Sequence, residues 1–209
     1  ASKEETQAVS ELCALYKDTI AYALDDLTGC SHPSASFKPK LRQKVTAGMR
    51  RQRLSPLEQE VTNEKCQELL DNKFIREATL EDNVTYVHPV VVAAKKDSAG
   101  EWKEKRFCID LRNTNSCTDQ DPYQMPLVDD LFAKMASANF FTTCDMRAGF
   151  NNVPVEHALQ RNLAFYWRGK IYVCTRMCFG HRNAPAMYQR VMDALIAEAG
   201  VEDSVVVYI

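Results

Sequence analysis

Residues 140–150 read FFTTCDMRAGF, an apolar run that ends in a carboxylate and continues through a turn to an aromatic ring. The apolar and β-branched residues before Asp145 predict a strand over 140–145. We expect Gly149 to let the backbone turn sharply, so that the strand end and the ring of Phe150 face one cavity. An aspartate after a strand often only caps the next turn. Asp145 is therefore a candidate metal ligand only if other parts of a site surround it.

Two further segments supply such parts. Residues 176–185 (RMCFGHRNAP) predict a turn that leads into a helix N-terminus, where backbone N–H groups favour anions. Upstream, the β-rich runs 86–94 and 106–111 predict a hairpin that carries the cations Lys95, Lys96 and Arg106. A carboxylate, an aromatic ring, a glycine turn and a cationic flap are the parts that nucleotidyl transfer requires. For the two lysines, a solvated hairpin tip is the alternative.

The remaining elements indicate an α+β fold. Apolar spacing predicts an amphipathic helix over 3–27 that packs on another surface, and the Ser55, Pro56 and Glu58 pattern predicts a capped helix over 56–72. Further predictions are a helix opened by Pro126, a hairpin of strands 163–167 and 171–175, a helix over 184–199 and a strand over 204–209. Because hairpins interleave with helices, a mixed or antiparallel sheet with helices on one face is favoured over a doubly wound parallel sheet.

Composition narrows the classes of protein. The chain has 209 residues with 45% hydrophobic content and a net charge of −2, and its apolar runs stay far below the roughly 20 residues of a membrane span. Eight cysteines without a C-x-x-C pair indicate reduced core thiols in an intracellular, reducing compartment, which is the cytoplasm or nucleus, with an organelle as the alternative. A zinc site of Cys174, Cys178 and His181 lacks a fourth ligand at sensible spacing.

Positive charge is concentrated in one stretch. Residues 38–53 contain no acid and seven cations: Lys38, Lys40, Arg42, Lys44, Arg50, Arg51 and Arg53. Clustered cations suit binding to a polyanion such as nucleic acid, because the release of counterions makes this binding favourable. A solvated arm that keeps the chain soluble is the alternative.

An ordered set of segments resembles the fingers and palm of reverse transcriptases, closest to Pol polyproteins of Ty3/gypsy-type LTR retrotransposons. The matching stretches, within about residues 54–209, are 69–76, 88–97, 106–115, 144–150 and 179–185. The resemblance implies a right-hand polymerase fold without thumb or RNase H. Its expected parts are an N-terminal helical extension (1–37), fingers (38–119 and 153–180) and a partial palm (120–152 and 181–209).

The resemblance also implies roles for the residues around the turn. Asp145, with the carbonyl of Met146, would bind catalytic Mg²⁺. Phe150 would exclude a ribose 2′-hydroxyl and so select dNTPs by shape. The alternative is that Phe150 is an ordinary core phenylalanine.

Six further residues receive roles from the same resemblance. Two cations would hold the incoming triphosphate, two residues would position the template strand, and two would border the nucleotide pocket. These pairs are, in order, Lys95 and Arg106, Asp110 and Arg112, and Phe179 and Gly180.

The chain departs from the family pattern at several positions. Residues 177–181 read MCFGH instead of Met-Pro-Phe-Gly-Leu, which suggests relaxed constraint, residues 123–126 read YQMP instead of Tyr-Pro-Leu-Pro, and Asn151 replaces a glutamine. The Tyr-x-Asp-Asp motif would begin at Tyr208, so its two aspartates would follow Ile209. Since one aspartate cannot hold two divalent ions, we expect residues 1–209 alone not to polymerise.

Two hypotheses follow. In the first, the chain is part of an RNA-directed DNA polymerase that binds an RNA or DNA template-primer and dNTPs. In the second, it is a domesticated, non-catalytic module that serves as a structural or RNA-binding subunit. Both leave strand 204–209 and helix 3–27 as surfaces that we expect a protein partner to cover.

Overall fold

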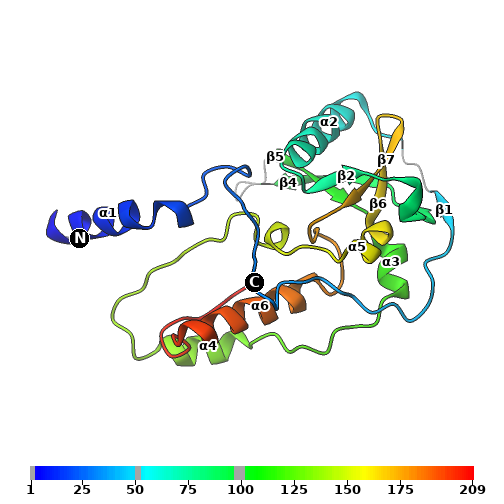
Figure 1. The fold of residues 1–209 in the computed structure, drawn as a ribbon. Coiled ribbons are helices and arrows are strands. Elements are labelled where there is room, and N and C mark those ends of the chain that lie inside the picture. Colours follow the sequence, from blue (N-terminus) through cyan, green and yellow to red (C-terminus); the bar gives the residue numbers. More distant parts are fainter. Residues whose placement is uncertain (1–2, 50–52, 97–101) are drawn as a thin grey trace.

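The computed structural model describes residues 3–49, 53–96 and 102–209. Helices and short strands alternate along the chain, and two of the three small sheets are antiparallel (Figure 1). The α-helices are α1 (Lys3–Leu15), α2 (Pro56–Asp71), α3 (Arg112–Cys117), α4 (Val128–Met135), α5 (His157–Gln160) and α6 (Ala184–Ala199). The strands are β1 (Gly48–Met49), β2 (Ile75–Glu77), β3 (Tyr86–Val87), β4 (Val90–Lys96), β5 (Trp102–Ile109), β6 (Ala164–Trp167) and β7 (Lys170–Cys174). Four 3₁₀ turns complete the list: η1 (Lys17–Thr19), η2 (Leu80–Asp82), η3 (Gly149–Asn152) and η4 (Arg161–Leu163). The α+β prediction is confirmed.

The sheet β2–β7–β6 forms around the predicted hairpin of β6 and β7. Arg168 and Gly169 both have positive φ, as a tight two-residue hairpin turn requires. Helix α2 begins at the predicted capping box of Ser55 and Glu58 and is tied to the hairpin, because Trp167 Nε1 donates to Asn63 Oδ1 at 2.8 Å. The buried side chains of Phe165 and Val173 place this sheet in the core.

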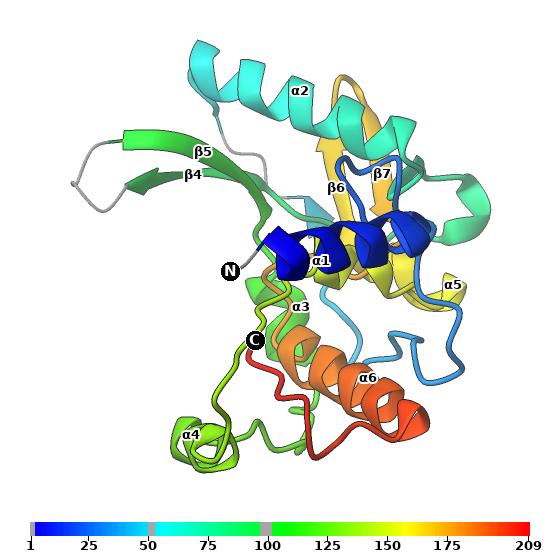
Figure 2. The same ribbon diagram turned by 90° about the vertical axis from the view of Figure 1, so that its left-hand side faces the viewer.

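The second predicted hairpin is also confirmed. Strands β4 and β5 pair antiparallel from Val90 opposite Ile109 outward, and Figure 2 shows this hairpin standing out from the body. It starts later than predicted, because Tyr86–Val87 pairs instead with β1 as a separate parallel pair. Its predicted turn falls partly on residues 97–101, which lie outside the described residues.

The N-terminal helix is shorter than predicted. It ends at Leu15, and every residue of α1 is exposed, so the expected packing partner is not within the described chain. The carboxylate of Asp26 accepts the N–H groups of Tyr22 and Ala23 at 2.8 and 2.9 Å. Such local side-chain bonds compete with helical ones, and the predicted helix does not resume over residues 20–27.

Residues 28–37 then join the body. Cys30 N donates to Asn152 O at 2.8 Å and Phe37 N donates to Pro154 O at 2.8 Å, while the Phe37 side chain is buried in the main core. This part of the predicted N-terminal extension is thus built into the fold.

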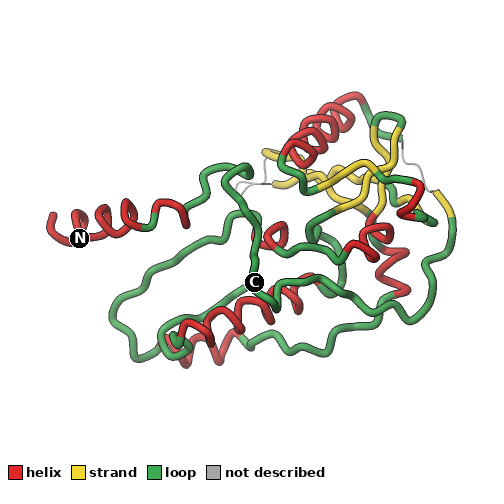
Figure 3. The backbone as a smooth tube through the Cα atoms, in the orientation of Figure 1, coloured by secondary structure: helices red, strands yellow, loops and turns green. Residues whose placement is uncertain are grey.

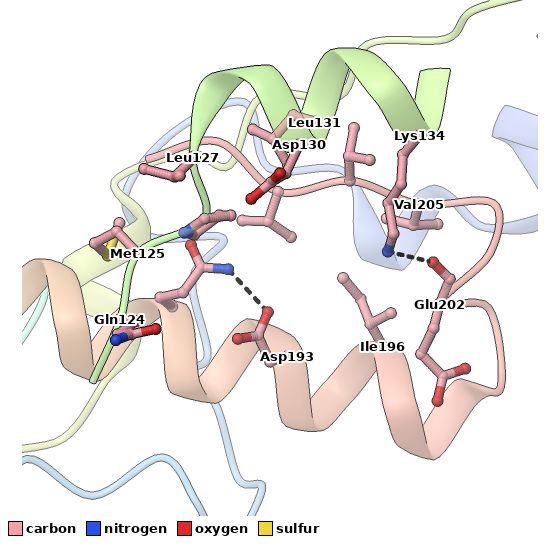
Figure 4. A pocket seen from close by; sticks show the side chains of 14 residues that line it. Gln124, Met125, Leu127, Asp130, Leu131, Lys134, Asp193, Ile196, Glu202 and Val205 are labelled. Atoms are coloured by element: carbon pink, nitrogen blue, oxygen red, sulfur yellow. Dashed lines mark hydrogen bonds between the residues drawn. The ribbon is translucent and has the colours of Figure 1, made fainter. Parts of the chain in front are cut away.

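Helices α4 and α6 form the lower part of the molecule in Figure 1. Helix α6 has its predicted bounds and ends at Gly200, whose φ of 65° suits glycine. Helix α4 begins at Val128, two residues after Pro126. The two helices, residues 124–127 and residues 202–207 line an open pocket of about 480 Å³, where Lys134 Nζ donates to Glu202 O at 3.0 Å (Figure 4).

The strands predicted over 140–145 and 204–209 are wrong. Both segments are loops (Figure 3), and Phe140, Phe141 and Tyr208 are largely exposed. β-Rich composition expresses only how well side chains suit a pleated surface, and a strand forms when a neighbour pairs with its N–H and C=O groups. No described segment pairs with either stretch.

The cysteines only partly match the prediction. Cys66, Cys117 and Cys174 are buried, whereas Cys13 and Cys144 are exposed. Among the residues described, no helix is long and apolar enough to cross a membrane.

A buried ion pair offers a first test of the fold. Arg76 binds Asp82 through two bonds of 2.8 and 2.6 Å, and the Asp82 side chain is only 3% exposed. We expect Asp82→Ala to lower the free energy of unfolding by about 3 kcal/mol, because a partly buried guanidinium loses its counter-charge. Urea unfolding at neutral pH measures this. In the exposed Lys65–Glu68 pair, Lys65→Ala should change stability by less than about 1 kcal/mol; equal effects would contradict the prediction.

Buried His181 offers a second test. Burial, aided by Arg182, lowers the pKa of His181 to about 4 from an ordinary 6.5, so the unfolded chain takes up the proton first. This contribution to stability is full above pH 6.5 and is lost as pH falls from 6.5 towards 4, by about 2 kcal/mol between pH 7 and 5. His181→Leu should therefore flatten the pH dependence of urea unfolding in that window, with the remaining slope partly due to His88, whose pKa burial also lowers. An unchanged slope would contradict this.

Candidate active site

Asp145 lies on the exposed loop that follows α4 and leads into η3. The sharp turn comes at Ala148, which has a φ of 44°, and not at Gly149 as the sequence suggested. A non-glycine residue in this left-handed region is uncommon and strained, so the surroundings must hold it there. Asn151 N donates to Ala148 O at 2.8 Å and closes the turn.

Gly149 is required for a different reason, which is close approach to α6. A Cβ atom at this position would lie 2.5 Å from Tyr188 Oη and 2.7 Å from Tyr188 Cζ. Only glycine therefore lets the turn rest on this buried tyrosine.

Three aromatic rings contact one another at the turn that follows Asp145. The Phe150 ring lies 5.1 Å from Phe179 and 5.4 Å from Tyr188, measured between centroids, and it meets Tyr188 edge to face. Tyr188 is buried, Phe150 is half-buried and Phe179 is 55% exposed, so the cluster runs from α6 out to the surface. The loop residue Met146 is 52% exposed.

The charge of Asp145 reaches this cluster. Burial raises the pKa of the Tyr188 hydroxyl, and Cys30 and the Asp145 carboxylate raise it further. The structure thus brings together Phe150 and Phe179, and it adds Tyr188. Sequence reasoning missed Tyr188, because an aromatic residue at helical spacing is indistinguishable from ordinary core.

The turn and the Phe179 loop are tethered to each other. Asn151 Nδ2 donates to Met177 O at 3.1 Å, and Asn152 Nδ2 donates to Arg147 O at 3.2 Å. The asparagine that departs from the family pattern is therefore a link between the two segments.

Gly180 holds the next turn, with a φ of 91° that favours glycine. Its carbonyl accepts a bond from Asn115 Nδ2 at 2.8 Å, and Asn115 Oδ1 accepts the N–H of Arg182 at 2.9 Å. Helix α3 thereby fixes the loop that carries Phe179.

His181 does not indicate relaxed constraint. It is buried, meets Phe37 edge to face at 4.7 Å, and its Nδ1 accepts the N–H of Asn183 at 3.2 Å. The ring stabilises the start of α6 by packing and by one hydrogen bond.

Asp110 and Arg112 form a bidentate ion pair where β5 passes into α3. Arg112 Nε and Nη2 lie 2.8 and 2.6 Å from the two carboxylate oxygens, and the bond from Asp110 raises the pKa of Arg112. The buried ring of His88 lies 2.9 Å from Asp110 O, which holds this backbone in place. The Arg112 side chain remains 80% exposed.

For Lys95 and Arg106 the structure describes the backbone only. Lys95 pairs with Glu104 and Arg106 with Ala93 on the β4–β5 hairpin, while their side chains lie outside the described residues.

Asp145 supplies one carboxylate, the donor type that Mg²⁺ prefers. The described residues contain no group of three or more His, Cys, Asp or Glu side chains that could hold a metal. They do not form a complete magnesium site, and the weighed zinc site of Cys174, Cys178 and His181 is absent from them as well.

Known proteins are similar to this chain both in sequence and in fold. Residues 93–209 match the family described as reverse transcriptase (RNA-dependent DNA polymerase). The Drosophila melanogaster Pol polyproteins from transposons 297 and gypsy are 35% and 32% identical over 137 and 138 residues, which is 66% and 65% of this chain but only 12% and 13% of those polyproteins.

A solved foamy viral protease–reverse transcriptase, in complex with double-stranded DNA, has the same fold with a TM-score of 0.76 at 19% identity. The match covers 100% of this chain and 34% of that one. By the match over more than half of its length, the chain belongs to the reverse transcriptase (RNA-dependent DNA polymerase) family.

Proposed function

We propose that the polypeptide carrying this chain is an RNA-directed DNA polymerase that adds dNTPs to a primer. The observation that carries the proposal is the cluster of Phe150, Phe179 and Tyr188 directly after Asp145. A flat apolar surface beside a carboxylate suits a nucleoside held next to its reacting phosphate. The similarity to transposon Pol polyproteins favours this function over a non-catalytic RNA-binding module.

In this proposal Phe150 selects the sugar. Its ring is half-buried, with Phe179 on the exposed side and Tyr188 on the buried side. A ring fixed in this way fills the volume that a 2′-hydroxyl would need, so discrimination follows from shape. Gly180 lets the Phe179 loop turn with a left-handed backbone, and a Cβ atom there would lie 3.4 Å from the carbonyl oxygen of Ile109.

Charged residues on the first half of the chain would bind the nucleic acid and the triphosphate. Arg112 presents an exposed guanidinium whose position Asp110 fixes, which suits a template phosphate. The exposed cations Lys38, Lys40, Arg42 and Lys44 extend the basic surface. Lys95 and Arg106 remain the proposed partners of the triphosphate.

Asp145 would contribute one ligand to Mg²⁺, together with the Met146 carbonyl. When bound, divalent ions neutralise charge on the transferred phosphate and lower the pKa of the attacking hydroxyl. The division into fingers (38–119 and 153–180) and palm (120–152 and 181–209) is likewise part of this proposal.

Asp145→Asn tests the proposal directly. We expect primer extension on an RNA template by the natural polypeptide to fall on the order of a thousandfold, because a lost ligand removes several kcal/mol of charge stabilisation. Asp129→Asn, at the start of α4, is the matched control and should retain activity. Undiminished extension by Asp145→Asn would refute the role of this carboxylate.

Phe150→Val tests sugar selection. The smaller side chain should raise incorporation of rNTPs relative to dNTPs by about tenfold or more, since it opens space at the 2′ position. Single-nucleotide incorporation with each substrate measures the ratio. Phe132→Val, on the exposed face of α4, should leave the ratio unchanged; if Phe150→Val also leaves it unchanged, Phe150 is a core residue only.

A further inference from the structure

Tyr188 combines deep burial with an unsatisfied polar group. The residue is 7% exposed, and its hydroxyl has no hydrogen-bond partner among the described residues. A buried hydroxyl without a partner costs free energy that a phenylalanine of the same shape would avoid. The part of this side chain that α6 buries is thus an aromatic ring whose polar tip the described residues leave unpaired.

The geometry connects Tyr188 with the turn that carries the site. The tip of its ring lies under Gly149, where even a Cβ atom would meet Oη at 2.5 Å. The edge-to-face contact with Phe150 uses the same ring. Tyr188 thus contacts two consecutive residues of η3, Gly149 and Phe150.

The two aromatic neighbours of Phe150 differ in exposure and in the element that carries them. Phe179 on one side is 55% exposed and belongs to a loop, whereas Tyr188 on the other side belongs to the sixteen-residue helix α6. An exposed loop side chain reorients easily, while a buried ring on a long helix does not. How far the Phe150 ring can retreat into the protein is therefore set by Tyr188.

We infer that Tyr188 is a positioning residue for Phe150, and that its ring fixes the depth of the sugar pocket and so sets discrimination between dNTPs and rNTPs. This inference rests on the proposed polymerase function. Tyr188 does not touch the nucleotide, and it acts through Phe150.

The test uses the natural polypeptide with Tyr188→Leu and Tyr188→Phe, and measures kcat and KM for one dNTP and the matching rNTP. In Tyr188→Leu the flat ring that supports Phe150 is lost, and Phe150 can move towards α6. The dNTP:rNTP ratio of kcat/KM should then fall about tenfold, mainly because the KM for the rNTP becomes lower. Tyr188→Phe keeps the ring and should retain the ratio within about threefold.

Tyr172→Leu is the matched control. Tyr172, on β7, is 6% exposed and packs against Phe165 and Trp167 on β6, so its loss should destabilise the fold similarly without changing the ratio. Thermal unfolding of all variants separates stability from selectivity. If Tyr188→Leu does not fold, Tyr188→Met supplies the same loss of a flat ring in a flexible side chain.

A double variant tests whether Tyr188 acts through Phe150. Adding Tyr188→Leu to Phe150→Val should lower the ratio no further, because the positioned ring is already gone.

The outcomes are distinct. A Tyr188→Leu enzyme with an unchanged ratio, a fall equal to that of Tyr172→Leu, or additive effects in the double variant would overturn the inference while leaving the polymerase proposal intact. A ratio lost equally in Tyr188→Phe would overturn it too, since the hydroxyl and not the ring would then carry the effect. A wild-type polypeptide that incorporates neither nucleotide would instead refute the proposed function itself.

Discussion

The site depends on a seam of backbone hydrogen bonds along residues 152–156. On one side, Asn152 O and Pro154 O accept the N–H groups of Cys30 and Phe37, at 2.8 Å each. On the other side, Val155 N donates to Thr175 O and Met177 N donates to Val153 O. Each bond adds little net free energy, but none of these buried groups can be left unpaired without a larger cost. The seam therefore fixes η3, and through it Phe150, relative to the Phe179 loop.

Local sequence signals predicted those elements whose stabilisation is local. Helix α2 has a complete capping box, α6 has Pro185 in its first turn and glycine at its end, and the β6–β7 hairpin has its tight turn. Their bounds agreed with the structure to within one or two residues. The strand predictions for 140–145 and 204–209 failed because a strand is stabilised by a neighbouring strand. Both stretches have the composition of strands, but no described strand lies beside them.

Single side chains account for the other differences. The N-terminal helix ends at Leu15 although the apolar spacing continues to residue 27, and Asp26 accepts the N–H groups of Tyr22 and Ala23 that a longer helix would use. Ala148 adopts the conformation expected of Gly149, because the glycine is needed where Tyr188 approaches. Asp145, Phe150, Phe179 and Gly180 could be selected by motif, but the contacts that support them could not. In the sequence Tyr188 is indistinguishable from a core residue, and no local pattern shows that Asn115 bonds to Gly180 or Cys30 to Asn152.

The attachment of residues 28–37 also has a mechanical consequence. Phe37 bridges to Val155 in parallel, and Cys30, seven residues earlier, bonds to Asn152, so a few separate contacts hold the segment to the body. A load applied to the chain before residue 28 would reach the bond between Cys30 and Asn152, at the end of η3, before it reached the contacts of Phe37. Because η3 also contains Phe150, tension on this segment would act on the turn that carries that ring.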